Sequence, residues 1–242
     1  MKRSRMTETI IKFTRGVPPP ESFPKEKLAE CAHQMLIHNA DVVLQYGDSR
    51  GYGPLRQLIA AENGISADRI LLGQGSLQMV DSCARMMLKP ADLVYVEEPT
   101  YDRTLTILKR ANAQIVGFPL EEDGPDVDAI EARLRGGERP VFFYLIPDFQ
   151  NPSGMVMSAS KRERIAALAQ EFKFWILEDI PYRRLRYRNH DLPSLFDLAP
   201  ERVMQLSSYS KLISPGLRVG FIIAAEAVAN PLATFAADTY IN

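Results

Sequence analysis

The sequence predicts an α/β fold with a mostly parallel sheet of seven strands flanked by helices. Short apolar runs bounded by turn residues recur along the chain, and helix-patterned segments lie between most of them. Near-continuous apolar strands joined by helical crossovers are typical of a parallel sheet covered on both faces, with ligands at the carboxyl ends of the strands. The runs are Ile70 to Leu72, Leu93 to Val96, Gln114 to Phe118, Val141 to Ile146, Phe174 to Leu177, Val203 to Leu206 and Val219 to Ile223.

The predicted helices have recognisable ends. Pro54 suits the first turn of a helix that ends near Gly64, Thr100 can cap a segment that runs to Asn112, and Asp126 can cap residues 127–134. Residues 161–172 carry apolar side chains on one helical face, namely Ile165, Leu168, Ala169 and Phe172. Residues 16–20 predict a stiff extended arm before a helix from Lys25 to His38. We expect residues 1–40 to form this arm and first helix, and residues 41–242 to form one large domain.

Composition excludes several classes of function. With 29 Lys+Arg against 30 Asp+Glu, the net charge of −1 gives no reason to expect nucleic acid as a partner. The most apolar run stops at Glu226, and the basic N-terminus leads into polar residues, so we expect neither a membrane span nor an export signal. Cys31 and Cys83 lie in helical patterns, which predicts buried reduced thiols and a cytoplasmic protein. The three histidines lack metal-ligand spacing, so no metal site is expected.

The most informative segment, residues 207–220, lies between two predicted strands and contains a single lysine. Hydroxyl groups, a Pro-Gly turn and an arginine surround Lys211, an arrangement that suits a phosphate beside an amine that can form an imine. Here the chain resembles the fold type I pyridoxal-phosphate (PLP) enzymes, specifically the class I/II aminotransferases. The resemblance implies pyridoxal 5'-phosphate as the cofactor, Lys211 as the catalytic Schiff-base lysine, and Ser208 and Arg218 as ligands of the cofactor phosphate.

Two further segments follow strands in the order that the resemblance implies. Asp179 would pair with the protonated pyridine nitrogen, as the electronics of the cofactor require, although a lone Asp after a strand is more often a cap or turn residue. Tyr182 would bond the phenolic oxygen of the ring. Asn151, in the turn-forming segment Asn-Pro-Ser-Gly, would bond the same oxygen and help to orient the substrate carboxylate.

The phosphate and ring contacts are completed by two earlier segments. Ser76 can be an ordinary N-cap, but the start of a helix also binds anions, and the resemblance places the phosphate against Gly75, Ser76 and the backbone of Leu77. Tyr101 follows another strand, where packing is the commoner role of a tyrosine; the resemblance implies that its ring stacks on the pyridine.

The resemblance also implies a homodimer with shared sites, because the tyrosine matching Tyr46 reaches the phosphate of the partner subunit. The segment 13–18 is similar to the family's substrate-covering arm, which makes Gly16 a candidate substrate-binding residue, and is most like the branch that contains aminoadipate and aromatic aminotransferases. In the family the chain continues into a smaller C-terminal domain that supplies an arginine for the substrate carboxylate. No residue here matches that arginine, so we expect a chain that lacks most of the small domain, binds PLP and transaminates poorly.

The function that these residues predict is amino transfer between an aromatic or dicarboxylic amino acid and a 2-oxo acid such as 2-oxoglutarate. Two alternatives remain open. Transcription regulators exist that use an aminotransferase-like domain to bind PLP as an effector, and the same cofactor site supports lyases and decarboxylases. Formation of glutamate from 2-oxoglutarate would separate a transaminase from a lyase.

Overall fold

The computed structural model describes Gly16 and residues 18–239. Phe13, Thr14, Arg15 and Val17 of the predicted arm, and residues 240–242, lie outside the described residues. Eight strands form the sheet: β1 (Ile70–Gly73), β2 (Leu93–Glu98), β3 (Gln114–Glu121), β4 (Gly124–Pro125), β5 (Phe142–Leu145), β6 (Trp175–Asp179), β7 (Val203–Ser208) and β8 (Gly220–Ile223). The α-helices are α1 (Lys25–His38), α2 (Ala40–Val43), α3 (Gly53–Asn63), α4 (Ser76–Met87), α5 (Asp102–Arg110), α6 (Val127–Arg135), α7 (Ala159–Phe172), α8 (Leu195–Leu198) and α9 (Glu226–Thr239).

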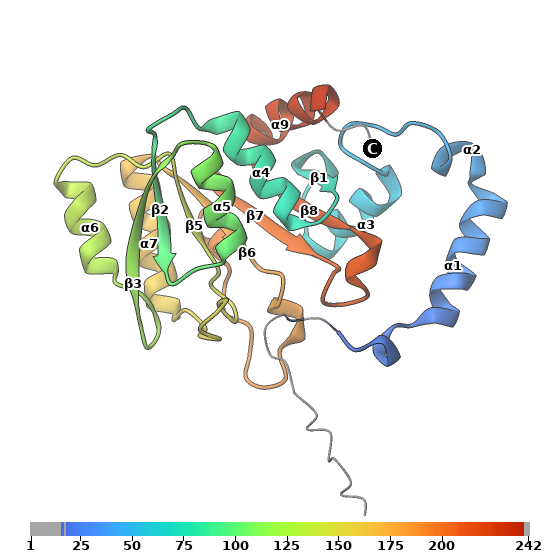
Figure 1. The fold of residues 1–242 in the computed structure, drawn as a ribbon, viewed down its shortest axis with the longest axis horizontal. Helices are drawn as coiled ribbons and strands as arrows, with labels where there is room; N and C mark the ends of the chain where they lie inside the picture. The colour runs from blue at the N-terminus through green and yellow to red at the C-terminus, as the bar shows by residue number, and fades with distance from the viewer. Residues whose placement is uncertain (1–15, 17, 240–242) are drawn as a thin grey trace, which may run out of the picture.

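The sheet has the order β1-β8-β7-β6-β5-β2-β3-β4 (Figure 1). The five central strands β3, β2, β5, β6 and β7 are parallel, while β8 runs antiparallel to both β7 and β1. The chain leaves β2 toward β3 on one side and returns to β5 on the other. Because ligands bind where the strand order reverses in this way, the carboxyl ends of β2 and β5 mark the expected crevice.

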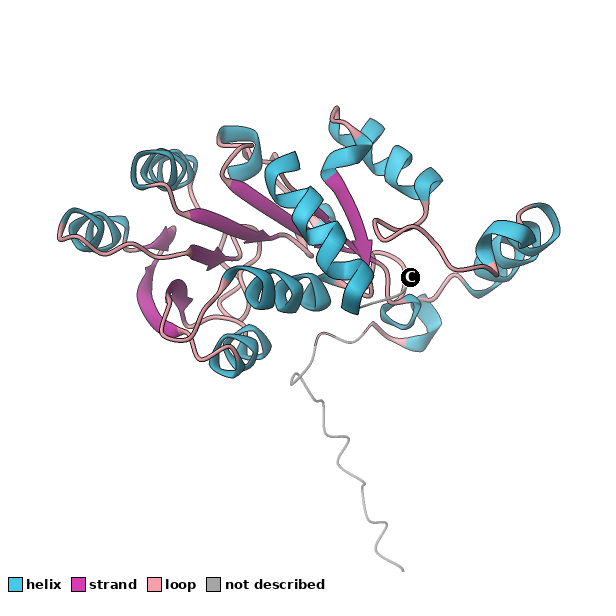
Figure 2. Cartoon of the chain, turned by 90° about the horizontal axis from the view of Figure 1, so that it is seen from above, coloured by secondary structure: helices cyan, strands magenta, loops and turns pink. Residues whose placement is uncertain are grey.

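Helices cover both faces of the sheet (Figure 2). Alternate side chains of each strand point to opposite faces, so Phe143 and Leu145 pack with α6 and α7, while Phe142 and Tyr144 pack with α4 and α9. This two-sided burial explains why the central strands consist of almost uninterrupted apolar runs.

Most of the predicted elements are confirmed, with three corrections. The seven predicted strands are present, but the sheet gains the two-residue strand β4, which pairs with the end of β3. Helix α5 begins at Asp102 rather than directly after Thr100, whose buried hydroxyl has no hydrogen-bond partner among the described residues, so Thr100 is not the cap. Cys83 is buried, whereas Cys31 is exposed because α1 buries none of its residues in the structure.

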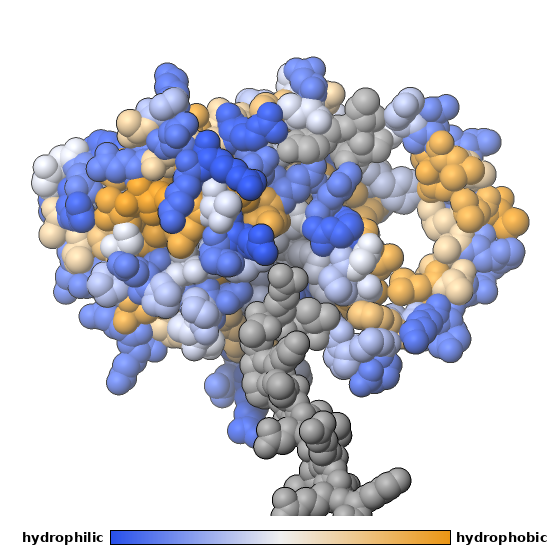
Figure 3. Space-filling model, viewed as in Figure 1, coloured by the Kyte–Doolittle hydropathy of each residue, from blue (hydrophilic) through white to orange (hydrophobic). Residues whose placement is uncertain are grey.

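Helix α1 projects away from the rest of the chain and continues into α2 (Figure 1). Large apolar side chains are exposed along this projection and just after it: Leu36, Ile37, Val42, Val43, Leu44 and Tyr46. They form an apolar surface over α1 and α2 (Figure 3). Surfaces of this kind mark sites of protein association.

Across residues 18–239, none of the helices has the length and hydropathy that a membrane span requires.

Candidate active site

A pocket lies at the carboxyl ends of the central strands and encloses about 230 Å³. Its lining comes from segments that are far apart in the sequence: Gly75, Ser76, Leu77, Tyr101, Ile146, Asn151, Asp179, Pro181, Tyr182, Ser208, Ser210, Lys211, Pro215 and Arg218. Apart from Tyr46 and Gly16, every residue predicted for the site belongs to this set. The sheet thus brings the predicted residues together, as the strand-end rule requires.

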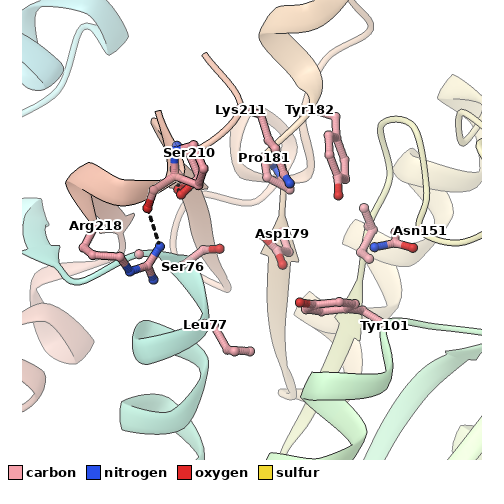
Figure 4. A pocket seen from close by; sticks show the side chains of 14 residues that line it. Ser76, Leu77, Tyr101, Asn151, Asp179, Pro181, Tyr182, Ser210, Lys211 and Arg218 are labelled. Atoms are coloured by element: carbon pink, nitrogen blue, oxygen red, sulfur yellow. Dashed lines mark hydrogen bonds between the residues drawn. The ribbon is translucent and has the colours of Figure 1, made fainter. Parts of the chain in front are cut away.

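One end of the pocket suits an anion. The N-cap of α4 is Gly75, with a φ of 94°, and no side chain caps the first turn of this helix. The free N–H groups of that turn and the positive end of the helix dipole therefore face the pocket, beside the guanidinium of Arg218 (Figure 4). Hydrogen bonds from Arg218 to the carbonyls of Gln74 (2.6 Å) and Pro215 (3.1 Å) hold the guanidinium in place.

A close approach of two backbones shapes this anion end. A Cβ atom built on Gly220 would lie 2.6 Å from backbone atoms of Gly75 and Ser76. Glycine in β8 therefore allows the strand to pack directly against the start of α4. The segment that carries Lys211 and Arg218 is held against the anion site by this contact.

Asp179 lies at the centre of the pocket, at the end of β6 (Figure 4). Tyr144 donates a hydrogen bond of 2.9 Å to its Oδ2, while Oδ1 is buried and has no partner among the described residues. Burial raises the pKa of Asp179 to about 6, and the hydrogen bond from Tyr144 opposes that rise. The carboxylate is therefore fixed on one side and keeps an acceptor available for a cationic N–H group.

Asn151 and Tyr182 lie together at the opposite end from Arg218 (Figure 4). The Asn151 amide lies beside the Tyr182 hydroxyl and acts to lower the pKa of that group. Burial and the nearby Asp179 raise the pKa of Tyr182, so its hydroxyl stays protonated and can donate. The pair offers two neutral donors at one point of the pocket.

Lys211 and Tyr101 lie on opposite sides of the pocket (Figure 4). Burial lowers the pKa of the Lys211 amine, because the charged form loses hydration. Its Nζ lies 5.9 Å from the centre of the Tyr182 ring and donates to the carbonyl oxygen of Gly16 at 2.5 Å. A partly desolvated amine of this kind is a better nucleophile and base than a surface lysine.

Behind the pocket lies another buried carboxyl group, that of Glu97 at the end of β2. Its Oε2 accepts hydrogen bonds from the Ile146 N–H (2.9 Å) and the Gln150 amide (3.3 Å), whereas Oε1 has no partner in the described part of the chain. Burial raises the pKa of Glu97 to about 8. Through Gln150, this group supports the loop that carries Asn151.

The remaining predicted residues lie outside the pocket lining. Tyr46 is 79% exposed and follows the projection formed by α1 and α2. The carbonyl of Gly16 accepts a hydrogen bond from the Lys211 amine, and the other described residue of the covering segment is Pro18. Within residues 18–239 no group of three His, Cys, Asp or Glu side chains is arranged to hold a metal ion.

Ser210 is one of the hydroxyl residues that the sequence places around Lys211. It lines the anion end, and its hydroxyl accepts a hydrogen bond of 2.8 Å from Ser208. The sequence alone predicts no role for Tyr144. Tyr144, which fixes Asp179, lies inside the apolar run 141–146, a pattern that predicts only a buried strand. A phenol within such a run needs a polar partner, and this was the signal that could have singled out Tyr144.

Comparison of the sequence with known proteins identifies the protein family of this chain. The family model described as aminotransferase class I and II matches residues 8–241. A 2-aminoadipate transaminase of Thermus thermophilus is 39% identical over 219 residues, covering 89% of this chain and 55% of that protein. Aromatic-amino-acid aminotransferase 1 of Thermococcus litoralis is 35% identical, with coverage of 90% and 55%.

The fold also matches that of a solved structure. The α-aminoadipate aminotransferase of Thermus thermophilus, solved in complex with N-(5'-phosphopyridoxyl)-L-leucine, superposes with a TM-score of 0.90 at 37% identity. The match covers 94% of this chain and 59% of the solved one. The chain belongs to the class I and II aminotransferase family, and it spans about half the length of the curated relatives that it matches.

Proposed function

We propose that this chain binds pyridoxal 5'-phosphate and carries the cofactor site of an aminotransferase. The observation that carries the proposal is the pairing of Lys211 with Asp179 in one pocket: a partly desolvated amine faces a space bounded by a buried carboxylate whose Oδ1 is unpartnered. The family match and the solved relative with a phosphopyridoxyl ligand support this assignment.

The residues present fit this cofactor at both ends. The uncapped start of α4, with Gly75, Ser76 and Leu77, would hold the phosphate together with Arg218 and the hydroxyl of Ser208. Oδ1 of Asp179 would accept from the pyridinium N–H, and Tyr101 would lie against the ring. Asn151 and Tyr182 would donate to the phenolic oxygen.

When bound, the cofactor supplies an electron sink that stabilises negative charge on the substrate α-carbon. Lys211 would provide the amine that holds the cofactor and the base that moves the substrate α-proton. Its lowered pKa keeps a larger fraction of Nζ neutral near pH 7, as a base and nucleophile require. Asp179 would keep its charge beside the pyridinium, because Tyr144 stabilises the carboxylate.

The substrates that we propose are an aromatic or dicarboxylic amino acid and a 2-oxo acid such as 2-oxoglutarate. Support comes from the relatives, which are named for 2-aminoadipate and for aromatic amino acids. Gly16, whose carbonyl accepts from Lys211, and Asn151 would contact the substrate. We propose that residues 41–242 are the PLP-binding domain and residues 1–40 an arm and first helix, in a cytoplasmic protein.

We also propose a homodimer in which Tyr46 reaches the site of the second copy. The exposed apolar surface of α1 and α2 and the 79% exposure of Tyr46 support this arrangement.

The test uses the purified chain loaded with PLP. A visible absorbance band of the bound cofactor, lost in Lys211→Ala, is expected, and amino donors with 2-oxoglutarate should yield glutamate. Absence of bound PLP would overturn the cofactor proposal. Consumption of the donor without glutamate would instead identify a lyase, and PLP binding without any amino-acid chemistry would favour the effector domain of a regulator.

A further inference from the structure

Asp148 is completely buried and is surrounded by three arginines. Arg162 binds both carboxylate oxygens, at 3.0 and 3.4 Å, and is itself fully buried. Arg183 donates to Oδ2 at 2.8 Å, and Arg186 donates to Oδ1 at 2.9 Å. Although burial alone would raise it, the arginines bring the pKa of Asp148 below its usual value, so the group is a carboxylate at neutral pH.

These arginines tie Asp148 to two separate loops. Arg162, on α7, also donates to the carbonyls of Pro147 and Met157, which lie at the two ends of the loop that contains Asn151. Arg183 directly follows Tyr182 and donates to the Leu192 carbonyl at 2.6 Å. One carboxylate thus joins the loop 147–157 to the loop 181–193.

A second contact holds the same loops together. The guanidinium carbon of Arg186 lies 4.8 Å from the centre of the Phe149 ring, and Arg186 Nε donates to Asp191 at 2.7 Å. Phe149 has a φ of 55°, a left-handed conformation that costs free energy and persists only where neighbouring contacts impose it. The backbone between Asp148 and Asn151 is therefore held by this charged cluster together with the contacts of Gln150.

We infer that Asp148, through Arg162, Arg183 and Arg186, is a positioning residue that places Asn151 and Tyr182 against the cofactor. The inference rests on the proposed function. Asp148 does not line the pocket; it lies three residues before Asn151, and its partner Arg183 follows Tyr182. Loss of its charge leaves three guanidinium groups near one neutral side chain, and both loops must move apart to hydrate them.

The experiment measures the pH midpoint of the visible band of PLP bound to Lys211. Donors to the phenolic oxygen stabilise the deprotonated chromophore, so their displacement raises the midpoint. We expect Asp148→Asn to raise it by about one pH unit, equivalent to about 1.4 kcal/mol, the scale of one hydrogen bond. Asp128→Asn, which removes an exposed ion pair with Arg164, is the matched control and should leave the midpoint unchanged.

The same substitution in a second background distinguishes a positioning role of Asp148 from a general disturbance of the fold. In an Asn151→Ala, Tyr182→Phe background, Asp148→Asn should shift the midpoint no further, because the groups that it positions are gone. An equal shift in both backgrounds, or an unchanged midpoint in the single variant, would overturn the inference. Arg183→Gln offers a gentler test if Asp148→Asn does not fold: Arg183 is partly exposed, Asp148 keeps Arg162 and Arg186, and a smaller upward shift is expected.

A chain that shows no visible band would refute the proposed function rather than this inference. Hydrogen exchange of the cofactor-free chain then tests whether Asp148 couples the two loops. The amides of loops 147–157 and 181–193 should both exchange at least about tenfold faster in Asp148→Asn, while the strands stay protected. Unchanged exchange, or faster exchange in only one loop, would contradict the coupling.

Discussion

The chemistry of the site depends on how single buried side chains are held. Asp179 would be a poor partner for a cation if its carboxylate could rotate or protonate freely. Tyr144 limits both, because it donates to Oδ2 and opposes the rise in the Asp179 pKa that burial causes. The position of this phenol on β5, beside β6, is set by the parallel register that pairs Tyr144 with Leu177.

Replacement of Tyr144 by Phe should weaken PLP binding. Loss of the donor raises the pKa of Asp179 above about 6, so more of the group is protonated at pH 7 and cannot accept from the pyridinium. We expect about a tenfold higher Kd for PLP at pH 7, with recovery as the pH rises. Tyr95→Phe, which removes a tyrosine bonded to Glu138 at 2.6 Å, is the control; an equal loss in both variants would argue against the role of Tyr144.

The raised pKa of Glu97 predicts that the unfolding free energy of the chain depends on pH. Its pKa is 4.5 when unfolded and about 8 when folded, so between these values the unfolded chain gains the charge while the folded chain stays neutral. Its contribution to stability is therefore complete below pH 4.5 and is lost as the pH rises toward 8.

The variant Glu97→Gln should not show this loss of stability at rising pH, because glutamine does not ionise. The difference in unfolding free energy between the variant and the parent chain, measured with urea, should move in favour of the variant by a few kcal/mol from pH 5 to pH 8. Every other titrating group cancels in that difference. The same difference at both pH values would show that Glu97 does not ionise in this window.

At the scale of the elements, the start of α4 and strand β8 act as one unit. Gly220→Ala would drive a Cβ into the backbone of Gly75 and Ser76, which must then shift. We expect at least about a tenfold loss in PLP affinity and a loss of stability of about 1–3 kcal/mol. Gly216→Ala, where the nearest atom would be 3.7 Å away, is the control, and equal affinities for the two variants would contradict the account.

Elements and strand-end residues could be predicted because their causes are local. Near-continuous apolar runs, the Asp126 cap of α6 and the end of α3 at Asn63 all follow from neighbouring residues. The ends of the strands in turn locate Asp179 and the segment that carries Lys211. Tyr144 and Asp148 could not be assigned in this way. Their roles depend on partners 35 residues or more away, Asp179 and Arg183, and on a register that no local pattern records.

The buried arginine of α7 illustrates the same limit. Arg162 lies three residues before Ile165, on the apolar face of the helix, yet an arginine at that position is usually assigned to solvent. It is buried because Asp148 and three backbone carbonyls satisfy its donors. Without the positions of those acceptors, the sequence favours the wrong environment.

At the scale of the whole molecule, the exposed apolar surface of α1 and α2 predicts self-association. Sedimentation velocity should show a dimer, and Leu44→Asp, at a position 74% exposed, should shift the chain toward monomer without unfolding it. Leu58→Asp changes another exposed leucine, which lies on α3 and outside this surface, and should leave the dimer intact. A monomeric parent chain at concentrations of tens of micromolar would contradict the homodimer.

The central claim is that Lys211 holds PLP in the pocket that Asp179 completes. Borohydride reduction of the PLP-loaded chain, followed by peptide mapping by mass spectrometry, tests it most directly, since reduction makes the link between cofactor and lysine permanent. The account predicts a single phosphopyridoxyl adduct on Lys211, absent from Lys211→Ala. An adduct on another lysine, or none at all, would contradict it.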